Sequence, residues 1–117
     1  MISVRSRKAK GRKLQQWVRD ELLKVFTSLN NNDVQSAIMG ESGQDIKLSN
    51  VAKESIKYSI ECKNKQTFKG IYDIMEQAQS NAEDKQIPLA IIKMNKLQPL
   101  AIVDASHFIK LIGEQNG

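Results

Sequence analysis

Residues 61–63 read Glu-Cys-Lys, an acid, a thiol and a base at the end of a stretch whose pattern otherwise predicts an apolar strand. Side chains alternate between the two faces of a strand, so Glu61 and Lys63 share one face and Cys62 lies on the other. Charges on a covered face are costly unless they are paired. We therefore interpret Cys62 as core filler, the usual place of a lone cysteine, and the opposite face as a candidate site.

A second acid, Asp45, follows a glycine-containing turn (GESGQD) in the preceding predicted strand. An antiparallel hairpin would bring Asp45 and Glu61 within reach of one ion. Two carboxylates that bind a divalent cation, with an ammonium group close by, recur in phosphodiester hydrolysis. Lys63 would then orient the nucleophile or offset charge that develops in the transition state. The alternative is an exposed hairpin whose ion pairs contribute less than about 1 kcal/mol.

The apolar pattern predicts the elements that position these residues. Helical spacing runs from about residue 10 to residue 29, and we expect Trp17 to anchor the core or a subunit contact rather than to stack on a base. Strand patterns follow at about residues 34–39, 44–49 and 56–64, and a helix at about 68–84. Two more strands, at about 88–94 and 100–105, precede a short helix capped by Ser106. This order predicts one α/β domain over residues 10–117, with a central mixed β-sheet flanked by helices.

The positive charge is concentrated at the N-terminus. The net charge is +5, yet six of the 18 basic residues precede position 14 with no acid among them. They are Arg5, Arg7, Lys8, Lys10, Arg12 and Lys13. We expect residues 1–9 to form a flexible basic arm, either a solvated tail or an arm that binds phosphates of a polyanion.

The composition excludes several classes of protein. One cysteine rules out an internal disulfide framework and is typical of a reducing cytoplasm. One histidine and one cysteine cannot form a zinc-type ligand set, so a metal here would be a hard cation held by carboxylates. No apolar run approaches the roughly 20 residues of a membrane span, and no signal peptide is evident, so we expect a cytoplasmic protein without membrane contact.

Two short motifs carry a family resemblance. The pattern G-x-D-I at residues 43–46, followed by I-E-C-K-N at residues 60–64, resembles the PD-(D/E)XK nuclease superfamily. Within it, the chain is similar to the small Holliday-junction resolvases of archaea and phages over about residues 8–112. The similarity includes the opening basic helix (KAKGRKLQQWVRDEL), a helix ending in QAQSNA and the strand PLAIIK. It implies a single restriction-endonuclease-like domain.

The resemblance also implies roles for individual residues. Asp45 and Glu61 match the metal-binding acids, Lys63 matches the catalytic lysine, and the backbone carbonyl of Cys62 is a further expected ligand to Mg²⁺, for which Mn²⁺ would substitute. In the archaeal resolvases an acid on the first helix, four residues after the glycine, completes the site. Counting from Gly11, that position is Gln15, which is a departure because glutamine brings a carbonyl oxygen but no charge.

The function that the resemblance implies is metal-dependent cleavage of branched DNA by a homodimer that cuts two strands symmetrically, in recombination and repair. The location would be the cytoplasm, or the host cytoplasm for a phage protein. The basic residues of the N-terminal arm, together with Lys65, would contact duplex or branched DNA through its backbone. Two alternatives stay open: a nuclease of the same fold that cuts other DNA structures, and a catalytically weak DNA-binding protein in which Gln15 marks lost activity.

Overall fold

The computed structural model describes residues 4–38, 41–66 and 70–115, and its centre is a pair of parallel strands. Strand β3 (Tyr58–Asn64) pairs with β4 (Ile87–Lys93), and β5 (Leu100–Ile102) adds to β4 in the antiparallel direction. A separate antiparallel hairpin is formed by β1 (Val34–Ser36) and β2 (Ile46–Leu48). The expected mixed sheet flanked by helices is therefore confirmed, although it is divided into two parts. The expected antiparallel hairpin between the strands of Asp45 and Glu61 is wrong, because β2 pairs with β1 and not with β3.

The division has a local cause beside the predicted site. The backbone N–H of Cys62 donates to Oδ2 of Asp45 at 2.8 Å, so a side chain takes the bond that a strand partner would have used. Asp45 consequently lies in a bend directly before β2 rather than inside that strand. The hairpin is still close to β3, because Ile46 and Ile60 belong to one buried cluster.

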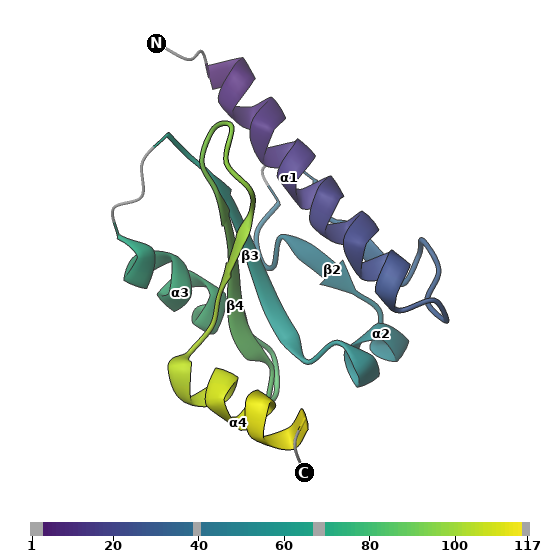
Figure 1. The fold of residues 1–117 in the computed structure, drawn as a ribbon. Coiled ribbons are helices and arrows are strands. Elements are labelled where there is room, and N and C mark those ends of the chain that lie inside the picture. Colours follow the sequence, from purple (N-terminus) through teal and green to yellow (C-terminus); the bar gives the residue numbers. More distant parts are fainter. Residues whose placement is uncertain (1–3, 39–40, 67–69, 116–117) are drawn as a thin grey trace.

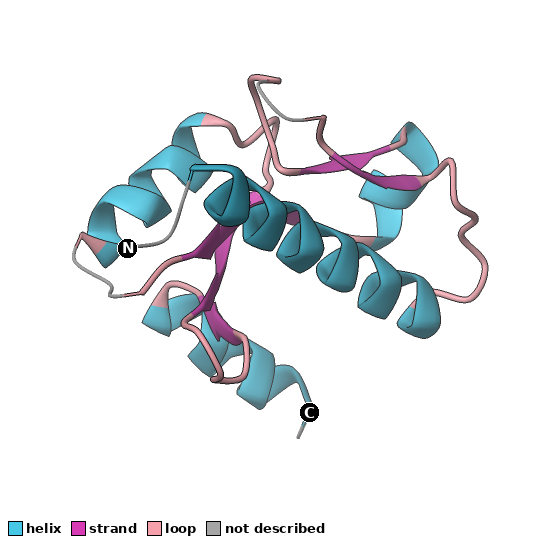
Figure 2. Ribbon diagram, turned by 90° about the horizontal axis from the view of Figure 1, so that it is seen from above, coloured by secondary structure: helices cyan, strands magenta, loops and turns pink. Residues whose placement is uncertain are grey.

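Helix α1 (Val4–Val25) packs against both β1 and β3, while α3 (Ile71–Ser80) packs against β3 and β4 (Figure 1). Seen from above, α1 crosses the molecule between the β1–β2 hairpin and the three-stranded sheet (Figure 2). On the α1 side, Leu14 and Val18 are buried against Ile60 and Cys62, which confirms Cys62 as core filler. Full burial of each such aliphatic side chain stabilises the fold by about 1.5–3 kcal/mol.

The opposite face of β3 is covered by α3. Ile74 packs with Ala90 and Ile92 of β4 in a second buried cluster. Ser59 on the same face is buried and donates from Oγ to the carbonyl of Ala78 at 2.9 Å. Because side chains alternate, Glu61 emerges on this α3 side, where the paired position on β4 is Ala90.

Helix α1 differs from its predicted form in length and in its apolar stripe. It begins at Val4, so residues 4–9 are its first turns rather than part of a flexible arm; residues 1–3 lie outside the described residues. Arg, Lys and Ala are good helix formers, and Gly11 alone, at about 1 kcal/mol, does not end the helix. Trp17 is 46% exposed, so of its two expected roles the core anchor is wrong, while the subunit contact stays a prediction.

Two further details of the helices were not expected. A short helix, α2 (Asn50–Ser55), begins where Ser49 Oγ accepts the N–H of Ala52 at 3.1 Å. Helix α4 (Ala105–Gln115) is capped by Asp104 instead of Ser106, since Asp104 Oδ2 accepts the N–H of His107 at 3.2 Å.

Helix α4 is joined to the sheet at its first turn. The hydroxyl of Tyr58 and Nε2 of His107 are hydrogen-bonded at 2.7 Å, so the only histidine has a structural role in this fold. Beyond that turn α4 has no buried residue. None of the described helices combines the length and apolar character needed to cross a membrane.

Candidate active site

The two acids predicted from the sequence lie together at the edge of β3. Asp45 is held there by the Cys62 N–H, and its carboxyl group lies close enough to Glu61 to raise the pKa of Glu61. Glu61 is only 2% exposed. An acid that is buried beside a second acid favours its protonated form, because two nearby carboxylates repel each other. The convergence expected of Asp45 and Glu61 is therefore present in the structure.

The pKa of Glu61 is raised well above the usual value of a glutamate side chain. Burial is the largest cause and the neighbouring Asp45 carboxyl the next, and the pKa of Glu61 is raised to about 8. Lys63 and a hydrogen bond with Asn81 oppose this rise in the pKa without cancelling it. At neutral pH the pair consequently retains a proton, and a cation bound between the carboxyl groups would take the place of that proton.

Backbone geometry places a further oxygen on the same side. The N–H and C=O of one residue in a strand point in the same direction, and the Cys62 N–H points to Asp45. The alternate residues face β4, as shown by the Lys65 N–H, which donates to the Lys93 carbonyl at 3.0 Å. The Cys62 carbonyl therefore faces the Asp45 side, as its predicted role requires.

A cavity of about 330 Å³, here called the carboxylate cavity, opens beside these groups. Helix α1 provides one wall and the end of β3 provides another. Its lining residues are Arg7, Lys8, Gly11, Gln15, Ala37, Ile38, Glu41, Asp45, Cys62, Lys63 and Asn64. Glu61 does not line this cavity and reaches it only through its contact with Asp45. The predicted residues Gln15, Asp45 and Lys63 thus share one space.

The oxygen atoms around the carboxylate cavity could bind a hard cation, with only two of them supplied by charged side chains. Among the described residues, Gln15 Oε1 and Glu61 Oε2 are both buried and have no hydrogen-bond partner. A buried acceptor without a partner costs about 1–3 kcal/mol, which a cation would relieve. In the described part of the chain, no three acidic, histidine or cysteine side chains are grouped to hold a metal. A Mg²⁺ ion would therefore rely on two carboxylates, neutral oxygens and water.

The basic residues predicted to bind DNA divide into three groups. Arg7 and Lys8 line the carboxylate cavity. Lys10 and Lys13 line a second cavity on a different side of α1, here called the lysine pocket, which is formed with the turn between β4 and β5. The other three, Arg5, Arg12 and Lys65, are exposed and line neither cavity.

Several residues around the site were not predicted. Asn64 lines both cavities, and Asn81 is bonded to Glu61. Lys93 and Lys96 line the lysine pocket, and the sequence signal that marks them is the short polar turn KMNK at residues 93–96. By contrast, Gln44 is structural, because its Nε2 donates to Gln86 Oε1 at 2.6 Å and to the carbonyl of Asn81 at 2.9 Å.

Comparisons of the chain with protein-family models, with curated proteins and with solved structures gave no match. The geometry of the carboxylate cavity, together with the motifs that line it, therefore indicates the function.

Proposed function

We propose that this protein is a Mg²⁺-dependent endonuclease that hydrolyses phosphodiester bonds of DNA at the carboxylate cavity. The observation that carries the proposal is the adjacent carboxyl groups of Asp45 and Glu61, with Lys63 on the same face of β3 as Glu61. Such a pair is costly to bury, since the two acids compete for one proton. A bound metal ion would offset this cost by neutralising the two carboxylates, and two hydrophobic residues at these positions could not bind such an ion.

Each residue has a defined part in the proposed reaction. Asp45, Glu61 and the Cys62 carbonyl would hold Mg²⁺, which supplies Lewis-acid polarisation of the phosphate and a more acidic water. Lys63 would offset the charge that develops on the phosphate oxygens. Gln15 would contribute its unpartnered Oε1 from α1, either to the ion or to a water.

The charges on α1 support a nucleic-acid substrate. Arg7 and Lys8 line the same cavity as Asp45, so positive charge is available at the place where a phosphate would otherwise be repelled by the acids. Lysine and arginine contacts to phosphates are the main source of affinity for DNA that does not depend on sequence.

Within this proposal the substrate is branched DNA, and the protein is a homodimer that resolves four-way junctions by paired cuts. The resemblance of the motifs to junction resolvases supports this choice of substrate. A dimer would need an apolar contact surface, and α4 exposes Phe108, Ile109 and Ile112 at 53%, 66% and 43%. Exposed apolar groups of this kind mark contact sites in many proteins.

A second candidate function is DNA binding with little or no cleavage. The observation that favours it is Gln15, which leaves the cavity one acid short of the set found in the archaeal resolvases. Under this alternative Mg²⁺ would have little effect on DNA, and the carboxyl pair would be a structural feature of the β3 edge.

The two candidates are separated by a cleavage assay on matched substrates. A labelled four-way junction is incubated with the protein beside linear duplex, flap and single-stranded DNA, with Mg²⁺ and with EDTA. We expect paired symmetric nicks in the junction with Mg²⁺ only. Cleavage of all substrates would keep the nuclease and remove the junction preference, whereas tight binding without cleavage in Mg²⁺ or Mn²⁺ would favour the binding protein.

A further inference from the structure

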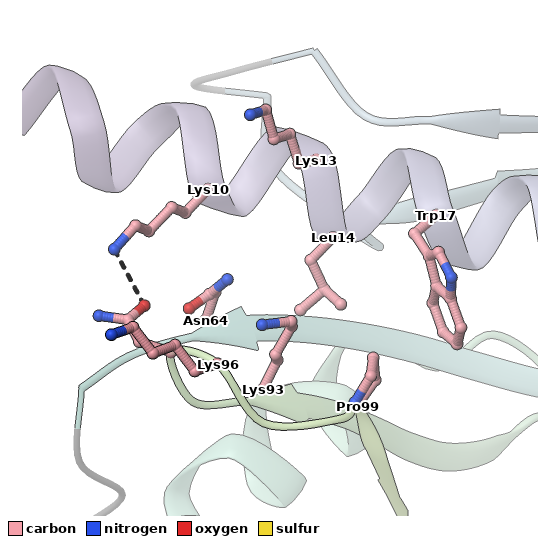
Figure 3. A pocket seen from close by; sticks show the side chains of 9 residues that line it. Lys10, Lys13, Leu14, Trp17, Asn64, Lys93, Lys96 and Pro99 are labelled. Carbon is pink, nitrogen blue, oxygen red and sulfur yellow. Dashed lines mark hydrogen bonds between the residues drawn. The ribbon is translucent and has the colours of Figure 1, made fainter.

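The lysine pocket is a cavity of about 550 Å³ between α1 and the β4–β5 turn (Figure 3). Its lining residues are Lys10, Lys13, Leu14, Trp17, Asn64, Lys93, Asn95, Lys96 and Pro99. This volume lies within the range of about 300–1,000 Å³ that is usual for small-ligand sites. The proposed cleavage reaction assigns no role to this pocket.

The charge of the pocket selects an anion. Four of its lining residues are lysines, and none of the described lining residues is acidic. Within the described part of the chain these four lysines make no salt bridge. Lys10 Nζ instead donates to Asn95 Oδ1 at 2.9 Å, the dashed line in Figure 3, which joins α1 to the β4–β5 turn.

The rest of the pocket selects a flat, partly apolar group. In Figure 3, Trp17 and Pro99 lie at one end and Lys10 and Lys96 at the other. The Trp17 indole is 46% exposed, so a face or edge of the ring is available to a ligand. In the part of the chain that the structure describes, Asn64 Oδ1 is buried without a hydrogen-bond partner, which provides an acceptor for a ligand N–H.

We propose that the lysine pocket receives an unstacked nucleotide of the bound DNA strand. The base would stack on Trp17 and donate a hydrogen bond to Asn64 Oδ1, while the flanking phosphates would be held by the lysines. The location suits this role because Asn64 lines both cavities and directly follows Lys63 on β3. The inference rests on the proposed function in one respect, namely that the ligand is DNA.

The chain offers a direct optical test, because Trp17 is its only tryptophan. Fluorescence is titrated in EDTA, where no cleavage is expected, with a short duplex that contains one unpaired central thymine and with the same duplex fully paired. We expect the bulged duplex to quench Trp17 and the paired duplex to quench it much less. Equal quenching by both, or quenching by neither, would overturn the proposal, as would stronger quenching by free thymidine 5′-monophosphate than by the bulged duplex.

A matched pair of lysines sharpens the test. Lys96 and Lys85 both have positive φ, 64° and 61°, in turns closed by the bonds Leu97 N–H to Met94 O and Gln86 N–H to Glu83 O. They lie beyond opposite ends of β4, and only Lys96 lines the pocket. Glycine relieves the strain of a positive φ, so Lys96→Gly and Lys85→Gly should both fold at least as stably as the wild type.

The two glycine variants lose the same charge in the same kind of turn. We expect Lys96→Gly to weaken binding of the bulged duplex about threefold to tenfold and Lys85→Gly to leave it unchanged. Trp17→Ala, followed by fluorescence anisotropy of labelled DNA, should weaken it about fivefold to 150-fold, because stacking of one base contributes about 1–3 kcal/mol. Equal effects of Lys96→Gly and Lys85→Gly would overturn the pocket assignment.

Failure of this inference and failure of the proposed nuclease give different results. If the wild type cuts the junction with Mg²⁺ but the bulged and paired duplexes quench Trp17 equally, the pocket assignment is wrong and the nuclease stands. If the bulged duplex is preferred but no DNA is cut with Mg²⁺ or Mn²⁺, the pocket assignment stands and the nuclease is wrong.

Discussion

The carboxylate cavity and the lysine pocket lie on two sides of the same helix and share Asn64, yet their chemistry is opposite. The first contains a half-buried Asp45 held by a backbone N–H beside a buried Glu61, whose raised pKa makes it retain a proton at neutral pH. The second has four lysines, an exposed indole and no acid among its described lining residues. Buried charged groups at fixed positions can stabilise the transition state of phosphodiester cleavage. Exposed lysine side chains contribute mainly to DNA affinity, through contacts with phosphates. Variants in the two cavities should therefore separate cleavage rate from affinity.

The largest effect is expected for Asp45→Asn. Asparagine can still accept the Cys62 N–H through Oδ1, so the fold should remain, but one charge for the metal ion is lost. We expect the single-turnover cleavage rate to fall by about a thousandfold or more, since metal activation supplies several kcal/mol of transition-state stabilisation. DNA affinity, measured by gel shift in EDTA, should be unchanged or higher because repulsion of phosphate decreases. The matched control is Asp84→Asn at an exposed position, and equal loss in both variants would contradict the assignment.

A comparison of two lysines should give the next largest effect. Lys63→Met removes the ammonium group that lowers the pKa of Glu61, so we expect cleavage at saturating protein to slow by about a hundredfold with DNA affinity nearly unchanged. Lys13→Met in the lysine pocket should weaken affinity and leave the saturating rate intact. If both variants alter only affinity, the functional division between the cavities is wrong.

A smaller effect is expected for the two basic residues at the rim of the carboxylate cavity. Arg7→Gln and Lys8→Gln should each reduce the slope of log affinity against log salt by about one, because each removes about one phosphate contact. The slope is measured by anisotropy at several salt concentrations. Lys110→Gln, on exposed α4, is the control and should leave the slope unchanged.

The smallest effect is a dependence of thermal stability on pH. The pKa of Glu61 is raised from 4.5 to about 8 in the folded chain, so the folded state binds more protons than the unfolded state between these values. In EDTA the melting temperature should therefore decrease as pH rises from about 5 to about 9, the opposite of the trend for acids such as Asp33 and Glu41, whose pKa values are lowered.

Two controls isolate the contribution of Glu61 to this trend. Mg²⁺ should reduce the decrease in melting temperature, because the cation replaces the shared proton. Glu61→Gln should also reduce it, since glutamine can bond to Asp45 without titrating. A melting temperature that rises with pH in EDTA over the same range would show that the pair does not retain its proton.

The sequence predicted the parts of the fold that depend on local pattern. The strand at Tyr58–Asn64 and the convergence of Asp45 with Glu61 follow from alternation and from a glycine turn, and both are present. The early start of α1 was missed because a run of basic residues resembles a disordered arm in composition, whereas Arg, Lys and Ala also favour helix.

Other features could not be predicted from the sequence, because they depend on tertiary contacts. The exposure of Trp17 depends on which elements pack against that part of α1, which apolar spacing alone does not specify. Likewise, the break between β2 and β3 arises from one side-chain bond of Asp45, and the lysine pocket requires α1 to meet a turn more than 80 residues away, as the Lys10–Asn95 bond shows.

The proposed nuclease requires that Asp45 and Glu61 bind a divalent cation, and this binding can be measured without DNA. Binding of Mn²⁺, a spectroscopic substitute for Mg²⁺, is followed by electron paramagnetic resonance for the wild type, Glu61→Gln and the exposed control Glu54→Gln. We predict a site in the wild type and in Glu54→Gln that is weakened about tenfold or more in Glu61→Gln, because one of two charged ligands is lost. Binding of equal strength in all three proteins, or in none of them, would contradict a metal-dependent nuclease at this site.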